Sequence, residues 1–254
     1  PTSAGVYVPI PDTTPPTGSV VINGGADFTN SQNVALTLAA SDENSGLSQV
    51  RLSNNGVNWA TYAYAESRSW TLSVGDGPKT VYVKYGDNAG NWSSAYTDTI
   101  TLDRKPPKGS FVINGGATHT GSMNVALTSS ATDATSGVSL MRFSNDNANW
   151  VVFPYAASAA WALTPGDGMK TVFGQYADAA GNWSVSTTAS ITVDGGAPQI
   201  TLLGSAEVTV AKGGTYVDAG ATALDAVEGD LTAKIVTVNP VDTLYPESIT
   251  YSVR

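Results

Sequence analysis

A block of sequence early in the chain returns 91 residues later. The segment DNAGNWS at residues 87–93 comes back as DAAGNWS at residues 178–184, and the sequence around it repeats at the same spacing. Laid over each other without a gap, residues 15–105 and 106–196 agree at about half of their positions. A fixed period of this kind marks an array of like units. We therefore divide the chain into residues 1–14, a first unit 15–105, a second unit 106–196 and a third segment 197–254.

The composition narrows the range of partners. The chain of 254 residues has a formal net charge of −9. This charge argues against binding to nucleic acid, because the phosphates of nucleic acid are bound by basic patches. There is no cysteine, which removes disulfides, thiolate chemistry and cysteine-based zinc sites. No stretch is apolar for long enough to span a bilayer. We expect no nucleic-acid partner and no membrane span in this chain.

Each unit reads as seven short strands with turn signals between them. In the first unit, Val34, Leu36 and Leu38 alternate with polar residues, as in a half-buried strand. Strands are predicted at residues 19–22, 33–40, 48–53, 59–63, around Trp70 and Leu72, and at 80–85 and 97–103. This is the pattern of an immunoglobulin-like sandwich without the disulfide, so the predicted fold class is all-β, with tandem immunoglobulin-like β-sandwiches.

The second unit departs from the first at two core positions. Ser129 and Gly174 stand where the first unit has Leu38 and Val83. Because both replacements remove apolar volume, we expect the core of the second unit to be less filled and the unit to be less stable.

The third segment has a different sequence with similar alternation. Strands are predicted at residues 199–203, 207–210, 215–224, 231–238 and 248–253. The segment then stops where a sandwich would still need a loop and its last strand. We expect a third immunoglobulin-like domain that is incomplete at its C-terminus.

The motifs of the two units resemble those of a known class of repeats. PPxGSxVINGGA, RxSN, GDGxKTV and DxAGNWS occur in both units, which look like the tandem Ig-like repeats of large bacterial surface proteins. Residues 198–254 are similar to another Ig-like module of bacterial surface proteins, also found beside pesticidal crystal toxins. That resemblance rests on ITL at 200–202, YVDAGATA at 216–223 and GDLT at 229–232. Together the resemblances imply an extracellular, cell-surface protein.

No catalytic constellation is apparent in the sequence. The single histidine, His119, has Phe28 at the matching position of the first unit. A catalytic group present in one copy and replaced by phenylalanine in the other is improbable, and no spacing suggests a nucleophile, base and orienting acid. We predict that the chain is not an enzyme and has no catalytic residues.

Acidic residues recur in loops that an immunoglobulin-like sandwich gathers at one end, beside the incoming linker. Oxygen ligands from several loops suit calcium. The alternative interpretation is that Asp and Asn in such loops bond their own backbone in Asx-turns. The candidate calcium ligands are Asp12, Asp42, Asp87 and Asn91 in one set, and Asp103, Asp133, Asp178 and Asn182 in the other.

Aromatic residues allow two interpretations as well. Rings on an edge strand could stack on a sugar, as in a carbohydrate-binding accessory region of a secreted enzyme. Alternatively, Trp70 and Trp161 lie in the cores and the other rings cover ends and edges of the sandwiches. The candidate glycan-stacking residues are Trp59, Tyr62, Trp150 and Phe153.

Both ends of the chain suggest strand exchange. Residues 5–10 alternate like a closing strand that belongs to no unit, while the third segment lacks one. One hypothesis is that the N-terminal strand of one subunit completes the third domain of the next, which builds a head-to-tail filament. The alternative is that Arg254 is a cut and the neighbouring domains of a longer chain supply the strand. The candidate interface residues are Val6, Val8, Ile10, Ile249, Tyr251 and Val253.

These observations converge on an extracellular rod of Ig-like modules. We expect it to be a structural or adhesive part of a bacterial surface protein or filament. The alternative is the carbohydrate-binding accessory region.

Overall fold

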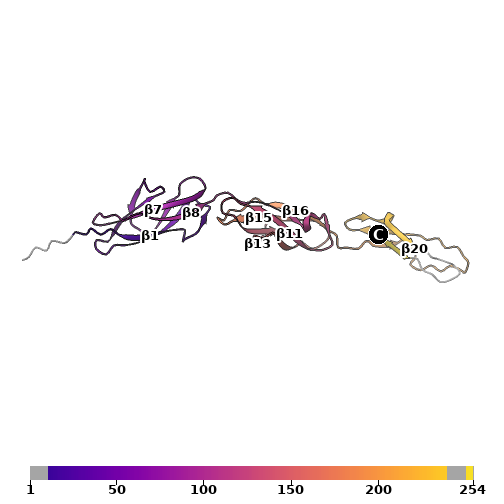
Figure 1. The fold of residues 1–254 in the computed structure, drawn as a ribbon. Coiled ribbons are helices and arrows are strands. Elements are labelled where there is room, and N and C mark those ends of the chain that lie inside the picture. The colour runs from indigo at the N-terminus through magenta and orange to yellow at the C-terminus, as the bar shows by residue number, and fades with distance from the viewer. Residues whose placement is uncertain (1–10, 239–249, 254) are drawn as a thin grey trace, which may run out of the picture.

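A computed structural model describes residues 11–238 and 250–253 of the chain. The described residues form strands and loops, with two short 3-10 turns, η1 (Asn114–Gly116) and η2 (Thr232–Lys234). Two sandwiches and a third, smaller module follow one another end to end, so the molecule is elongated (Figure 1). No helix in the described parts has the length and apolar character needed to cross a membrane.

The first unit is a sandwich of a three-stranded and a five-stranded sheet. The strand order is β1-β3-β6 in one sheet and β2-β8-β7-β4-β5 in the other. Neighbouring strands are antiparallel except β2 and β8, which are parallel. The strands are β1 (Thr17–Ile22), β2 (Phe28–Thr29), β3 (Asn33–Ser41), β4 (Leu47–Ser53), β5 (Ala60–Ala63), β6 (Ser67–Thr71), β7 (Gly77–Asp87) and β8 (Tyr96–Leu102).

The second unit repeats this arrangement strand for strand. Its sheets have the order β9-β11-β14 and β10-β16-β15-β12-β13, with β10 and β16 parallel. The strands are β9 (Lys108–Ile113), β10 (His119–Thr120), β11 (Asn124–Thr132), β12 (Val138–Ser144), β13 (Val151–Pro154), β14 (Ser158–Ala162), β15 (Gly168–Asp178) and β16 (Thr187–Val193).

Alternation along the strands builds a separate core in each unit. On β3, Val34, Leu36 and Leu38 are buried and the residues between them are exposed, as predicted. The prediction of tandem immunoglobulin-like sandwiches is confirmed. The seven expected strands of the first unit are present, and an eighth, β2, was missed because two residues are too few to show alternation.

The tryptophans predicted to be core residues are only partly buried. Trp70 and Trp161 pack against the cores of their units from the edge strands β6 and β14. Each indole Nε1 donates a 2.8 Å hydrogen bond to an asparagine side chain, Asn54 or Asn145. The indole N–H needs such a partner, which holds these rings at the rim of the core.

The gap expected in the second core at Gly174 is filled, while the lower stability expected of this unit stays a prediction. Phe111 and Phe143 replace Val20 and Leu52 of the first unit, and their rings meet edge to face with centroids 5.1 Å apart. A Cβ added at Gly174 would lie 2.6 Å from the Phe111 ring, so the larger ring occupies the volume that the glycine leaves. Ser129 in turn lies 3.2 Å from the Tyr176 hydroxyl, which gives this buried serine a polar partner.

The third module forms two small sheets among its described residues. One contains β17 (Gln199–Leu202), β18 (Ala221–Asp225) and β19 (Gly229–Asp230), and the other pairs β20 (Ile235–Val238) with β21 (Thr250–Val253). The prediction of a strand at 207–210 is wrong, and the strand predicted at 215–224 begins only at Ala221. Val208 and Val217 lie in this irregular stretch with exposed side chains, so alternation there has no sheet face to bury.

We predict that Phe111 and Gly174 are energetically coupled. Gly174→Val should destabilise the second unit by roughly 1–3 kcal/mol through overpacking, and Phe111→Val should destabilise it through a cavity. The double variant restores the residues of the first unit at these positions. Its loss of unfolding free energy should therefore be smaller than the sum of the two single losses by about 1 kcal/mol or more.

The measurement is amide hydrogen exchange of the second unit within the whole chain. Gly121→Ala is the control, because its added Cβ makes only an ordinary contact of 3.5 Å. Strictly additive losses would contradict the proposed packing.

Candidate metal centres at the ends of the units

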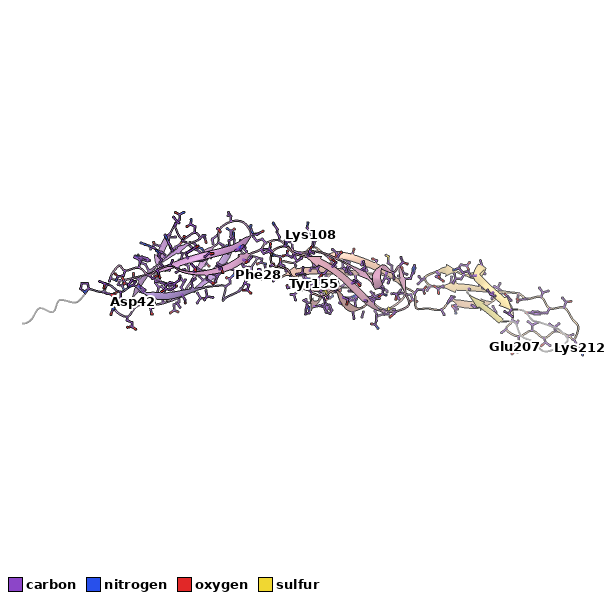
Figure 2. All side chains as sticks on the ribbon, viewed as in Figure 1. Phe28, Asp42, Lys108, Tyr155, Glu207 and Lys212 are labelled. Carbon is purple, nitrogen blue, oxygen red and sulfur yellow. The ribbon has the colours of Figure 1, made fainter. Side chains whose placement is uncertain are left out.

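Each unit gathers acidic residues at the end that faces the incoming linker. In the first unit, Asp42 follows β3, Asp87 ends β7, and Asp12 precedes β1. Figure 2 shows Asp42 at this end of the unit and Phe28 at the opposite end, next to the second unit. The sandwich topology brings these loops together because β3 and β7 both end there.

The first predicted set of aspartates forms a cluster. One carboxylate oxygen each from Asp12, Asp42 and Asp87 lie within 4.8 Å of one another. Asp42 Oδ1 accepts hydrogen bonds from the backbone N–H groups of Ser45 (2.9 Å) and Gly46 (2.8 Å), which is an Asx-type turn. Asp12 Oδ2 is enclosed and has no hydrogen-bond partner.

The second set forms an equivalent cluster at the junction between the units. Oxygens of Asp103, Asp133 and Asp178 again lie within 4.8 Å of one another. Asp103 is the residue after the last strand of the first unit, yet its Oδ2 accepts hydrogen bonds from Ser136 Oγ (2.6 Å) and Ser136 N (3.2 Å) of the second unit. Asp103 is fully buried, with 0% of its surface exposed, so the end of one unit is inserted into the next.

The two asparagines of the predicted sets act as hydrogen-bond donors. Asn182 Nδ2 donates to Asp178 Oδ2 (2.7 Å) and to the Asp103 carbonyl (2.9 Å). Asn91 makes the same pair of bonds to Asp87 (2.8 Å) and Asp12 (3.1 Å). They therefore tie the linker to the loop through Nδ2, and the ligand role of their Oδ1 atoms stays a prediction.

Hydrogen bonding keeps the buried carboxylate of the first cluster ionised. Burial by itself would raise the pKa of Asp87, but hydrogen bonds from Asn91 and the Gly90 N–H outweigh burial and hold that pKa below its usual value. Among the described residues, the ion pairs to Lys or Arg involve Asp76 and not these clusters. Each cluster thus presents several negative oxygens without a basic side chain, an arrangement that suits a hard divalent cation.

The rings predicted as a glycan-stacking platform do not share one surface. Tyr62 and Phe153 pack against the cores of their units. Trp59 and Trp150 are not among the residues packed against the cores, and a cationic side chain lies over each ring. Lys84 Nζ is 5.0 Å from the centroid of the Trp59 ring. Arg142 lies over two rings in the second unit, 4.8 Å from the Trp150 centroid and 4.2 Å from that of Trp183.

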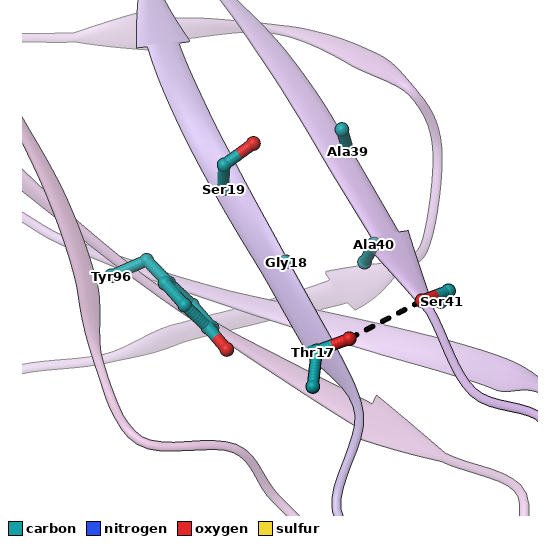
Figure 3. Close-up of a pocket in the computed structure, with 7 residues that line it drawn as sticks. All are labelled: Thr17, Gly18, Ser19, Ala39, Ala40, Ser41 and Tyr96. Carbon is teal, nitrogen blue, oxygen red and sulfur yellow. Dashed lines mark hydrogen bonds between the residues drawn. The ribbon is translucent and has the colours of Figure 1, made fainter.

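Two further features of the described residues show no constellation of catalytic groups. His119 is exposed on β10, and its Nδ1 lies 3.0 Å from Thr118 Oγ1. A hollow of 440 Å³ beside β1 and β3 is lined by small and uncharged side chains together with Tyr96, and Thr17 and Ser41 are hydrogen-bonded across its mouth (Figure 3). Its lining offers no ionised group for catalysis.

The predicted strand-exchange interface falls largely outside the described residues. Val6, Val8, Ile10 and Ile249 lie outside the described residues, as do the side chains of Tyr251 and Val253. The backbone of β21, which includes these last two residues, pairs antiparallel with β20 of the same chain.

Comparison with known families gives one match, in the third module. Residues 200–254 match the family described as Bacterial surface protein, Ig-like domain. This module is similar to a bacterial surface Ig-like domain. The match spans the third module alone, and a search of curated proteins finds no match.

Several solved structures have a similar arrangement of strands. The fibronectin(III)-like modules of Clostridium thermocellum CbhA match with 14% identity and a TM-score of 0.47, covering 68% of this chain and 93% of theirs. The D00-D0 domain of intimin matches with 14% identity and a TM-score of 0.31, covering 70% and 99%. Chitinase ChiA74 from Bacillus thuringiensis matches with 16% identity and a TM-score of 0.32, covering 71% of this chain and 30% of the chitinase.

Proposed function

We propose that the chain is a load-bearing rod of Ig-like modules in an extracellular bacterial surface protein, serving as a structural or adhesive stalk. The observation that carries the proposal is the insertion of Asp103 into the second unit. A linker whose first residue, Asp103, is fully buried and bonded through both its side chain and its carbonyl couples the two units rigidly. The similarity of residues 200–254 to a bacterial surface domain favours an extracellular or surface location. Modules of this kind are typically non-catalytic.

This proposal predicts that the parent protein is found at the cell surface and that the chain does not bind polysaccharides. Antibodies raised against the chain should label intact cells of the source organism. The chain itself should not be retained on soluble or insoluble polysaccharides, because the rings of Trp59 and Trp150 are occupied by cations. Labelling only after lysis would contradict the surface location. Retention that Trp59→Ala or Trp150→Ala abolishes would instead support the carbohydrate-binding accessory region.

We further propose that calcium binds the two aspartate clusters and stiffens the linkers. The first cluster supports this proposal, because Asp12 has an enclosed carboxylate oxygen without a hydrogen-bond partner, and Asp12 forms one group with the carboxylates of Asp42 and Asp87. Asp42 and Asp133 would complete the ligand sets from the loops after β3 and β11. A bound cation would offset the repulsion between the three carboxylates of each cluster.

Calcium should therefore raise the melting temperature. A ligand that binds only the folded state at about 100 times its Kd stabilises that state by about 2.7 kcal/mol, which corresponds to a rise of several degrees or more for domains of this size. The measurement is calorimetry of the whole chain in millimolar calcium and in chelator.

The variants Asp42→Asn and Asp133→Asn test the sites, because asparagine keeps the Oδ1 acceptor of the turn and removes the charge. Together they should reduce the calcium response. Asp27→Asn, an exposed acidic position outside both clusters, is the control and should leave the response unchanged. Equal melting temperatures in calcium and chelator would rule the proposal out.

Head-to-tail assembly by strand addition stays a prediction. If it occurs, the chain should form concentration-dependent oligomers in sedimentation velocity, and a chain lacking residues 1–12 should remain monomeric. Removal of these residues without any effect on assembly would reject strand exchange.

A further inference from the structure

The two junctions of the rod differ in charge at equivalent positions. At the first junction, Arg104 and Lys105 follow the end of β8, and both face Asp76 of the first unit, with Arg104 Nε 2.8 Å from Asp76 Oδ1. Arg104 holds the pKa of Asp76 below its usual value. At the second junction, the equivalent residues are Gly195 and Gly196, so both cations are missing.

Asp167, the equivalent of Asp76, keeps its place without a guanidinium partner. Its Oδ1 accepts a hydrogen bond from the backbone N–H of Gly195 (3.1 Å). The ammonium group of Lys170, in the same hairpin, donates a hydrogen bond to the Pro165 carbonyl (3.1 Å). The linker after β16 therefore runs past an uncompensated carboxylate.

A cleft of 340 Å³ lies between the second unit and the third module. It is lined by His119, Thr120 and Gly121 from the second unit, by the linker residue Asp194, and by Glu228 from the third module. The backbone N–H of Asp194 donates to the Thr120 carbonyl (2.9 Å), which places the linker against the second unit. Two carboxylates and the single histidine of the chain thus line one cleft.

Negative charge accumulates around this cleft. Asp225 of the third module is buried and accepts hydrogen bonds from the N–H groups of Val227 and Glu228. Burial raises the pKa of Asp194, and the carboxylates of Asp225, Glu228 and Asp167 raise it further, with His119 acting in the opposite direction. Four groups therefore act on Asp194: three carboxylates and one imidazole.

We propose that the junction between the second unit and the third module is a pH-sensitive hinge, loosened by carboxylate repulsion at neutral pH and stiffened on acidification, whereas the first junction stays rigid. The docked arrangement crowds these carboxylates, so it binds a proton more tightly than a separated arrangement would. Protonation consequently favours docking.

The pH window follows from the direction of the shift. When the junction is docked, the pKa of Asp194 lies above its ordinary value of 3.8. The docked state therefore becomes more stable relative to the separated state as the pH falls from neutrality toward that raised pKa. Protonation of Asp194 therefore stiffens the junction at low pH.

Spin labels on either side of the hinge test the proposal. The chain has no cysteine, so Val185→Cys and Val217→Cys provide unique labelling sites, and both positions are at least 80% exposed. In chelator, the distance distribution measured by double electron–electron resonance should be broad at pH 7.5 and clearly narrower at pH 4.5. Unfolding of the third module would broaden the distribution at low pH, so narrowing cannot arise from loss of structure.

Matched variants identify the groups responsible. Gly195→Arg with Gly196→Lys transfers the residues of the first junction to the second, and the distribution should then be narrow at both pH values. Asp194→Asn should narrow the distribution at pH 7.5. Labels at Val57→Cys and Val151→Cys, across the first junction, should give a narrow distribution throughout.

An equal width at both pH values in the unmodified sequence would overturn the proposal. So would a pH response that survives both the Gly195→Arg/Gly196→Lys variant and Asp194→Asn. Because chelator is present throughout, these outcomes do not depend on calcium binding.

Discussion

The buried carboxylate of Asp103 is the interaction on which the rod depends. A carboxylate removed from water requires hydrogen-bond donors, or its desolvation would destabilise the fold. Its donors are the N–H of Lys105 on the linker and both donors of Ser136 on the next unit. The same residue's carbonyl accepts from Asn182, so two loops of the second unit are held to one linker residue.

This constraint explains why the repeated motif is a loop. Asp178 and Asn182 in the DAAGNWS segment bond to each other, and Asn182 also bonds to the linker, so the turn is shaped in advance for Asp103. Serine ends the motif for a further reason, since Ser184 Oγ accepts from the N–H of Tyr176 and donates to the Val185 carbonyl. The motif therefore couples the last turn of one sandwich to the end of the unit before it.

Much of the fold could be predicted because both units obey alternation. Strand positions followed from residues such as Val34, Leu36 and Leu38, and the convergence of each aspartate set followed from the repeat combined with sandwich topology. The compensation between Phe111 and Gly174 could not be predicted, because it depends on which residues oppose each other across the two sheets. The donor role of Asn182 escaped prediction for a similar reason, since an amide can present either its oxygen or its nitrogen.

The repeat also shows which properties of the rod vary independently. Asp76 and Asp167 occupy equivalent places, and the end of each unit carries an aspartate, Asp103 or Asp194. What differs is the pair that follows, arginine and lysine at one junction and two glycines at the other. The cationic pair neutralises the neighbouring carboxylate and restricts the backbone, while the glycines do neither. Two linker residues therefore set the stiffness of a junction without altering the sandwich on either side, and a chain built from units of one fold can combine rigid and hinged joints.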